Sequence, residues 1–192
     1  LATCFVSDGD QIDIVYPTYD NFRSVIECAG GHINYVDQNR ITNENSFETD
    51  SKIFYIVNPN NPSGKLFDKS LLKKIIRKNK STLFIVDEAY IEYSGLDNSL
   101  CPLIEDNLLV CRTFSKAFSL AGLRIGYAVA HEELIETLNL VRNPKSVTMF
   151  AQIGAISALK NISYMYEHVN KVSEHKNLFE NYLKTNFKDI EV

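Results

Sequence analysis

Apolar runs alternate along most of the chain with segments whose apolar residues recur every three to four positions. Several runs are almost wholly apolar and end in turn residues, a pattern typical of strands buried on both faces of a parallel sheet. The predicted strands are 11–15, 32–36, 52–57, 83–86, 108–112 and 125–130. We predict that the first two are short β-rich strands and that the last four are buried.

Segments with helical periodicity separate these strands. The stretch from Asn21 to Ala29 is predicted to be a helix closed by two glycines. Another helix is predicted after Asp68, a suitable N-cap, and the row of cations opposite its apolar face is interpreted as a solvated surface. From His131 onward the pattern is helical to the end of the chain. The first five residues resemble the end of a helix that begins earlier, so we expect the sequence to be a piece of a longer protein.

The alternation of strands and helices indicates an α/β protein with a mainly parallel sheet covered on both faces. The sequence shows neither an internal repeat nor a low-complexity tract. No domain boundary is visible before about residue 160. We therefore predict one large domain over residues 1–160 and a helical segment over residues 161–192 that leads towards a further domain.

Composition and charge narrow the classes of function. The chain has 192 residues, 45% of them hydrophobic, which suffices for one good-sized core. Its net charge of −4 gives no support to a nucleic-acid partner. No apolar run approaches the ~18 to 20 residues that a membrane span requires. The four cysteines are irregularly spaced, without a CxxC pair or a histidine cluster, so we expect no metal site and the reduced thiols of a cytoplasmic protein.

Polar residues gather directly after three of the predicted strands. They are the turn NPNNPSG at 58–64, then Asp87, Glu88 and Tyr90, and finally Thr113, Ser115, Lys116 and Arg124. Functional residues of parallel sheets collect at the carboxyl ends of the strands, where the loops converge. Each feature alone has an ordinary explanation as a turn, a helix cap or a surface lysine. Their joint occurrence in this order indicates a functional site.

Together these residues supply what pyridoxal phosphate needs from a protein. The cofactor needs an amine for its aldehyde, a carboxylate that keeps its ring nitrogen protonated, and donors for its phosphate. Lys116 supplies the amine, which desolvation and the nearby Arg124 would make a usable nucleophile and base. Asp87 supplies the carboxylate. Thr113 and Ser115 suit the phosphate, together with the two-pronged guanidinium of Arg124.

The motifs around these residues resemble those of the class I/II aminotransferases, which are fold-type-I pyridoxal-phosphate enzymes. Within that group the chain is most similar to the histidinol-phosphate aminotransferases. The resembling motifs are PTYDNF (17–22), NPNNPSG (58–64), VDEAY (86–90), TFSKAFSLAGLRIGY (113–127) and RNPKSVTMFAQIGAISAL (142–159). The likeness covers about residues 1–160, and it implies a three-layer α/β/α large domain with a mainly parallel sheet.

The resemblance implies a role for each candidate residue. Lys116 would bond the cofactor aldehyde and move the proton between the substrate Cα and the cofactor C4′. Asp87 would pair with the pyridine nitrogen. Tyr90 and Asn61 would hydrogen-bond the phenolic oxygen.

The remaining roles concern the phosphate and the face of the ring. Thr113, Ser115 and Arg124 would hold the phosphate. Tyr19 matches the position whose ring stacks on the cofactor, although Phe22 is an alternative. The family's activity implies an amino donor and a 2-oxo acid acceptor, amino-acid biosynthesis as the setting, and a homodimer as the assembly.

Two parts of the family's site are expected to lie outside this sequence. A short phosphate-binding segment should precede Leu1, and the small domain with the arginine that receives the substrate carboxylate should follow Val192. A decarboxylase of the threonine-phosphate type shares the same motifs and stays open as an alternative. A regulator that keeps the cofactor domain as a sensor would need a DNA-binding module, and none is visible. A dinucleotide-binding sheet is disfavoured because no G-x-G-x-x-G follows a strand.

Overall fold

The computed structural model describes residues 1–19, 21–43 and 47–187, which form two compact units. The first unit comprises Leu1–Thr113 and Gly126–Val147, and the second comprises Phe114–Ile125 and Thr148–Val192. The predicted division at about residue 160 stays a prediction about the whole protein.

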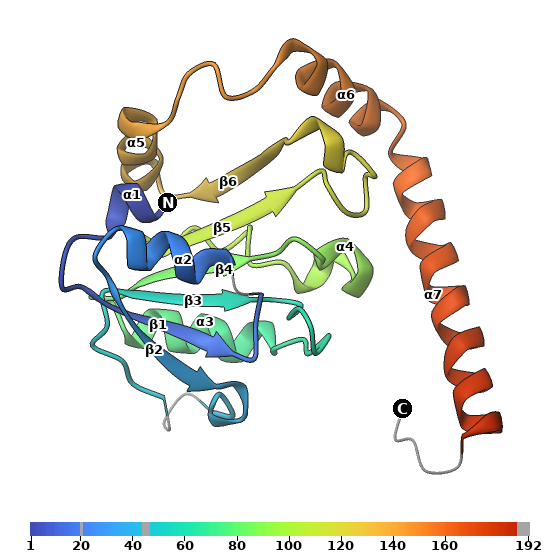
Figure 1. Cartoon of the computed structure of the whole chain (residues 1–192), viewed down its shortest axis with the longest axis horizontal. Coiled ribbons are helices and arrows are strands. Elements are labelled where there is room, and N and C mark those ends of the chain that lie inside the picture. The colour runs from blue at the N-terminus through green and yellow to red at the C-terminus, as the bar shows by residue number, and fades with distance from the viewer. Residues whose placement is uncertain (20, 44–46, 188–192) are drawn as a thin grey trace. The chain divides into compact units, whose positions relative to one another are not determined.

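A six-stranded sheet forms the centre of the first unit (Figure 1). Its strands are β1 (Gln11–Tyr16), β2 (His32–Asp37), β3 (Ile53–Val57), β4 (Leu83–Asp87), β5 (Leu108–Thr113) and β6 (Gly126–Ala130). The spatial order is β2-β1-β3-β4-β5-β6, and every pair is parallel except β5 with β6. The predicted α/β class with a mainly parallel sheet is confirmed, and all six predicted strands are present.

The prediction that residues 125–130 form a buried strand was wrong. The first two residues of β6 are exposed and the other three are only half-buried. The cause is its place at the edge of the sheet, where it pairs with β5 alone. An apolar run does not distinguish an edge strand from a central one, because both carry β-forming residues.

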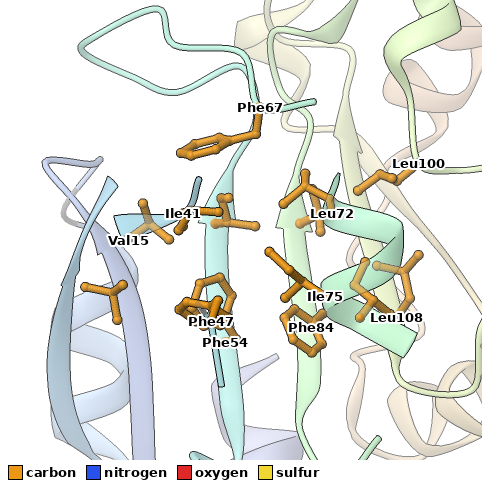
Figure 2. Packing of buried hydrophobic residues seen from close by; sticks show 14 of the residues in the cluster. Val15, Ile41, Phe47, Phe54, Phe67, Leu72, Ile75, Phe84, Leu100 and Leu108 are labelled. Carbon is orange, nitrogen blue, oxygen red and sulfur yellow. The ribbon is translucent and has the colours of Figure 1, made fainter. Parts of the chain in front are cut away.

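Helices cover both faces of the sheet, as expected for three layers. One face packs against α3 (Lys69–Lys78), whose Leu72, Ile75 and Ile76 meet strand residues such as Phe84 in one apolar cluster (Figure 2). The other face packs against α1 (Ala2–Phe5), α2 (Asn21–Cys28) and α5 (Glu132–Val141).

The start of α3 shows how local sequence sets these elements. The Asp68 side chain accepts a hydrogen bond of 2.7 Å from the N–H of Leu71, so Asp68 is the N-cap that the sequence predicted. In a different helix, α2, the chain turns just after the C-terminal end at Gly30, whose φ of +85° is a conformation that suits glycine. A short helix that was not predicted, α4 (Ile91–Ser94), follows β4.

The second unit is built from one loop and two helices. The loop, Phe114–Ile125, contains a 3-10 turn at Ala121–Leu123. The helices are α6 (Met149–Lys160) and α7 (Ile162–Asn186), as the helical pattern of this region predicted. In α6, a Cβ on Gly154 would lie 2.5 Å from Leu123 Cδ1, so glycine permits close contact between the loop and this helix.

Candidate active site

Asp87 is the last residue of β4, in register with Val57 of β3 and Cys111 of β5. Its Oδ2 accepts a hydrogen bond of 3.0 Å from the Tyr55 hydroxyl. Its Oδ1 accepts another of 3.0 Å from the backbone N–H of Ala89. One donor comes from the neighbouring strand and the other from the turn that follows Asp87. The carboxylate is therefore held in a defined orientation at the carboxyl edge of the sheet.

Tyr55 is a member of this site that the sequence did not reveal. Its buried ring stacks on Phe22, with ring centroids 4.3 Å apart and an interplanar angle of 28°. Burial, followed by the charge of Asp87, raises the pKa of Tyr55 well above its ordinary value. The phenol therefore keeps its proton at neutral pH and remains a donor. The only sequence signal was a hydroxyl within an apolar run, which needs a partner when buried.

The two aromatic residues considered for ring stacking have different surroundings. Phe22 already uses one face of its ring against Tyr55. The Tyr19 side chain lies in the loop before α2, is 49% exposed, and its hydroxyl accepts a hydrogen bond of 2.5 Å from Asn21 Nδ2. An exposed ring is the more accessible platform for a ligand, so Tyr19 stays the predicted stacking residue.

Asn61 lies in the turn after β3, which two buried asparagines fix. Asn58 Oδ1 accepts a hydrogen bond of 2.8 Å from the N–H of Phe67. Asn60 Nδ2 donates one of 2.8 Å to the carbonyl of Pro17, just after β1. The loops that follow β1 and β3 are thus joined, and Asn61 is carried on a fixed turn. The turn was predicted from the sequence and Asn61 was named as its ligand by resemblance, but the hydrogen bonds of Asn58 and Asn60 that fix the turn were not predicted.

The two other predicted residues of the first unit lie at the ends of β4 and β5. Tyr90 is the N-cap residue of α4 and is half-buried. Thr113 is the last residue of β5 and pairs with Gly126. A Cβ on Gly126 would lie 2.7 Å from the carbonyl oxygen of Arg112, so the close pairing of β5 and β6 requires glycine there.

A buried ion pair supports the same edge and was also missed. Arg112 Nη2 donates to Glu92 Oε1 at 2.6 Å, and the two side chains are 11% and 2% exposed. The Arg112 guanidinium also lies 5.9 Å from the centroid of the Tyr127 ring. Burial acts to lower the pKa of Arg112, but the hydrogen bond and the charge of Glu92 outweigh it and raise that pKa. The pair joins α4, which follows Tyr90, to Arg112 of β5, the residue before Thr113.

The second unit carries the predicted lysine on a loop that is closed at its base. The Phe114 N–H donates to the carbonyl of Ile125 at 3.1 Å, and the Leu120 N–H donates to the carbonyl of Phe114 at 2.9 Å. Within the loop, Ser115 is half-buried and Lys116 is exposed. These bonds give the lysine a defined backbone, and its side chain lies at the surface of the unit.

Arg124 lies near the other end of the same loop, in a left-handed backbone conformation with φ of 51°. Its Nη1 donates a hydrogen bond of 2.9 Å to the carbonyl of Ala121, and its side chain is exposed. Residues other than glycine rarely adopt this conformation, and such strain is often found at functional sites. Ser115, Lys116 and Arg124 therefore belong to one closed loop.

The chemistry of the donor set fits pyridoxal phosphate. The first unit offers the oriented carboxylate of Asp87 together with the side chains of Asn61 and Tyr90. The second unit offers an amine, a hydroxyl and a guanidinium on one loop. Burial, followed by the charge of Asp87, raises the pKa of the neighbouring Cys111 thiol to about 12. That thiol stays protonated and is a poor nucleophile.

The whole chain, residues 1–192, matches the family described as aminotransferase class I and II. It belongs to that family. A dihydroxyacetone phosphate transaminase of Campylobacter jejuni is 41% identical over 199 residues, covering 96% of this chain and 52% of that protein. A histidinol-phosphate aminotransferase of Geotalea daltonii is 32% identical over 181 residues, covering 93% of this chain and 52% of that protein.

The fold also matches a solved structure of the family. A histidinol-phosphate aminotransferase of Sinorhizobium meliloti, in complex with pyridoxal-5'-phosphate, superposes with a TM-score of 0.83 at 24% identity, covering 90% of this chain and 50% of that one. This similarity confirms the predicted fold of the aminotransferase large domain. The chain spans about half the length of the curated relatives it matches. Among the residues that the structure describes, no helix is both long and apolar enough to cross a membrane.

Proposed function

We propose that the protein is a pyridoxal-phosphate-dependent aminotransferase that moves an amino group between a small amino compound and a 2-oxo acid. The observation that carries the proposal is the Asp87 carboxylate, fixed by two donors at the carboxyl edge of the sheet, in a chain of this family. A carboxylate held in this manner suits a protonated ring nitrogen, since charge-assisted hydrogen bonds are strong and directional.

The proposed roles follow from the chemistry of each side chain. When bound, pyridoxal phosphate supplies an electron sink that makes the substrate Cα–H acidic. Lys116 would hold the cofactor through its aldehyde, and the lysine amine, once the substrate amine has displaced it, would take the proton from the substrate Cα and return it. General acid–base help of this kind contributes on the order of 10²–10⁴ in rate. Asp87 keeps the ring nitrogen protonated, and Tyr90 and Asn61 donate to the phenolic oxygen.

The other side chains bind and orient the cofactor. Thr113 and Ser115 donate to the phosphate. The Arg124 guanidinium, which donates to the Ala121 carbonyl in this structure, binds the phosphate in place of that carbonyl. Tyr19 stacks on the ring. Both the loop strain at Arg124 and the exposure of Tyr19 are compatible with groups that rearrange when a ligand arrives.

We further propose that the substrate carries a phosphate group. Two relatives are named for phosphorylated compounds: one is a dihydroxyacetone phosphate transaminase and the other a histidinol-phosphate aminotransferase. The family resemblance favours a cytoplasmic homodimer that serves amino-acid biosynthesis. The relatives differ in the rest of their substrates, so the phosphate is the shared part that we carry over.

Borohydride reduction of the cofactor-loaded whole protein, followed by peptide mapping, tests the central role. We expect the label on Lys116 and the loss of the cofactor absorbance band in Lys116→Ala, with circular dichroism unchanged. A label on a different lysine would refute the assignment.

A second assay separates transamination from the decarboxylase alternative. The protein is incubated with phosphorylated amino compounds and 2-oxoglutarate, and carbon dioxide release is compared with formation of the new amino acid. We expect amino-group transfer without carbon dioxide. Release of carbon dioxide in step with substrate consumption would instead establish the decarboxylase.

A further inference from the structure

A histidine on α7 reaches the loop that carries Lys116. His168 Nδ1 lies 3.0 Å from the carbonyl oxygen of Ala117, the residue that follows the lysine. A carbonyl oxygen can only accept, so Nδ1 bears the proton and donates. Ala117 is itself 2% exposed, so its carbonyl belongs to a protected part of the loop. The two ends of this bond are 51 residues apart in the sequence.

Residues 116–119 form a turn, called the lysine turn below. The same imidazole nitrogen also approaches the far end of this turn, at Ser119. Ser119 Oγ lies 3.4 Å from His168 Nδ1 and can accept a share of its proton. Ser119 has a left-handed backbone with φ of 58°, and its N–H donates to the carbonyl of Lys116 at 2.9 Å. The turn is closed from within by that bond, and His168 holds it from outside at two points.

The packing around this turn is incomplete. A pocket of about 580 Å³ opens beside it, and its lining includes Leu120, Ala158, Asn161 and Met165 as well as His168. Side chains next to such a space have fewer contacts to fix them than side chains in a filled core. The hydrogen bond from His168 therefore carries a larger part of the restraint on the turn.

We propose that His168 is a positioning residue that fixes the backbone of Lys116 through Ala117 and Ser119. The inference rests on the proposed role of Lys116 and deepens it. Misplacement of a reacting group by about 1 Å can cost up to 10²-fold in rate, so a loose turn slows the reaction without removing the lysine.

Three substitutions at His168 separate positioning from mere folding. In His168→Ala the donor is lost. In His168→Asn the amide nitrogen takes the place of Nδ1, so the bond is retained. In His168→Gln a polar side chain remains, but its donor lies one methylene further out. His175→Ala, an exposed histidine of the same helix, is the matched control.

The first measurement is amide hydrogen exchange of the peptide 114–125 in the cofactor-free protein, which does not depend on what Lys116 does. We expect exchange about 2- to 12-fold faster in His168→Ala and His168→Gln, the range that corresponds to the loss of one hydrogen bond. His168→Asn and His175→Ala should exchange like the parent protein. Equal exchange in the parent and His168→Gln would overturn the inference, even if His168→Ala fails to fold.

The second measurement uses the cofactor-loaded whole protein. We expect His168→Gln to lower kcat by about 10- to 100-fold with little change in KM. We also expect it to shift the pH midpoint of the absorbance of the lysine-bound cofactor. In His168→Asn, kcat and this midpoint should both return to the parent values. An unchanged kcat and midpoint, with borohydride still labelling Lys116, would overturn the positioning role and leave the proposed function standing. A label elsewhere would overturn the proposed function, whereas the exchange result would still decide whether His168 holds the turn.

Discussion

The Tyr55 hydroxyl donates a hydrogen bond of 3.0 Å to Oδ2 of Asp87 across neighbouring strands of the sheet. The tyrosine is buried and stacks on Phe22, so the donor is itself fixed before any ligand binds. The backbone N–H of Ala89 restrains the other carboxylate oxygen. Because both oxygens of the Asp87 carboxylate are already oriented, the carboxylate does not have to reorient when a cationic ring nitrogen binds, which is the advantage of a preorganised site.

Removing the Tyr55 hydroxyl should weaken cofactor binding without breaking the fold. In Tyr55→Phe the ring still stacks on Phe22, but Asp87 loses the hydrogen bond from the Tyr55 hydroxyl. We expect the Kd for pyridoxal phosphate to rise by about 2- to 10-fold, as for the loss of one hydrogen bond. Absorbance titration of the cofactor measures this. Tyr35→Phe, on the exposed edge strand β2, is the control and should bind normally; equal Kd values in both variants would contradict the role of Tyr55.

Alkaline pH should destabilise the protein through the same tyrosine. Burial and then Asp87 raise the pKa of Tyr55 above its ordinary value of 10.0, whereas in the unfolded chain the phenol releases its proton near that value. The folded state therefore binds more protons than the unfolded state above pH 10, and the stability contributed by Tyr55 is present below pH 10 and lost as the pH rises further.

Urea unfolding at pH 8, 9.5 and 10.5 measures this effect. Cys111 acts in the same direction because its pKa is also raised, so the parent protein must be compared with Tyr55→Phe, which retains Cys111. We expect the free energy of unfolding to fall between pH 9.5 and 10.5 more steeply in the parent, by up to about 1.4 kcal/mol per pH unit for one proton. Identical slopes would show that Tyr55 does not titrate differently on folding.

The sequence predicted those parts of the fold and site that depend on neighbouring residues in the chain. The runs 52–57, 83–86 and 108–112 were correctly predicted as buried strands, because burial on both faces leaves a continuous apolar pattern in the sequence. Asp68 was correctly predicted as an N-cap because its side chain bonds a backbone N–H only three residues away. Asp87 and Lys116 could be predicted as site residues because each lies at or shortly after the end of a strand, within a short motif.

The missed relationships join residues that lie far apart in the sequence. Asp87 and Tyr55 are separated by 32 residues, and the Glu92–Arg112 pair by 20. Such contacts depend on the order of strands in the sheet, and no local periodicity encodes that order. The edge position of β6 was missed for the same reason.

The buried pair of Glu92 and Arg112 should be the most sensitive ion pair to substitution. Glu92→Gln leaves the Arg112 guanidinium buried without its counter-charge, and breaking a buried pair typically costs about 3–5 kcal/mol. We expect a loss of that size in the free energy of unfolding, measured by urea titration.

Two further variants serve as its controls. Glu180→Gln, which removes an exposed i,i+4 pair with Lys176, should cost less than about 0.5 kcal/mol. The double variant Glu92→Leu with Arg112→Met should recover much of the loss, because an apolar pair of similar volume needs no counter-charge. A small loss in Glu92→Gln would show that water compensates the arginine.

Replacing the charge of Asp87 while keeping its shape should separate binding from chemistry. Asp87→Asn retains hydrogen-bonding groups at the carboxyl end of β4 but cannot hold a proton on the ring nitrogen by opposite charge. A hydrogen bond to a charged group is worth about 1.5–3 kcal/mol, so we expect kcat for amino transfer to fall by about 10- to 150-fold. Stopped-flow half-reactions with a phosphorylated amino donor measure it, and borohydride should still label Lys116. Since Tyr55→Phe leaves the charge in place, its kcat should fall far less. Equal rates in the parent and Asp87→Asn would mean that this carboxylate does not serve the cofactor ring.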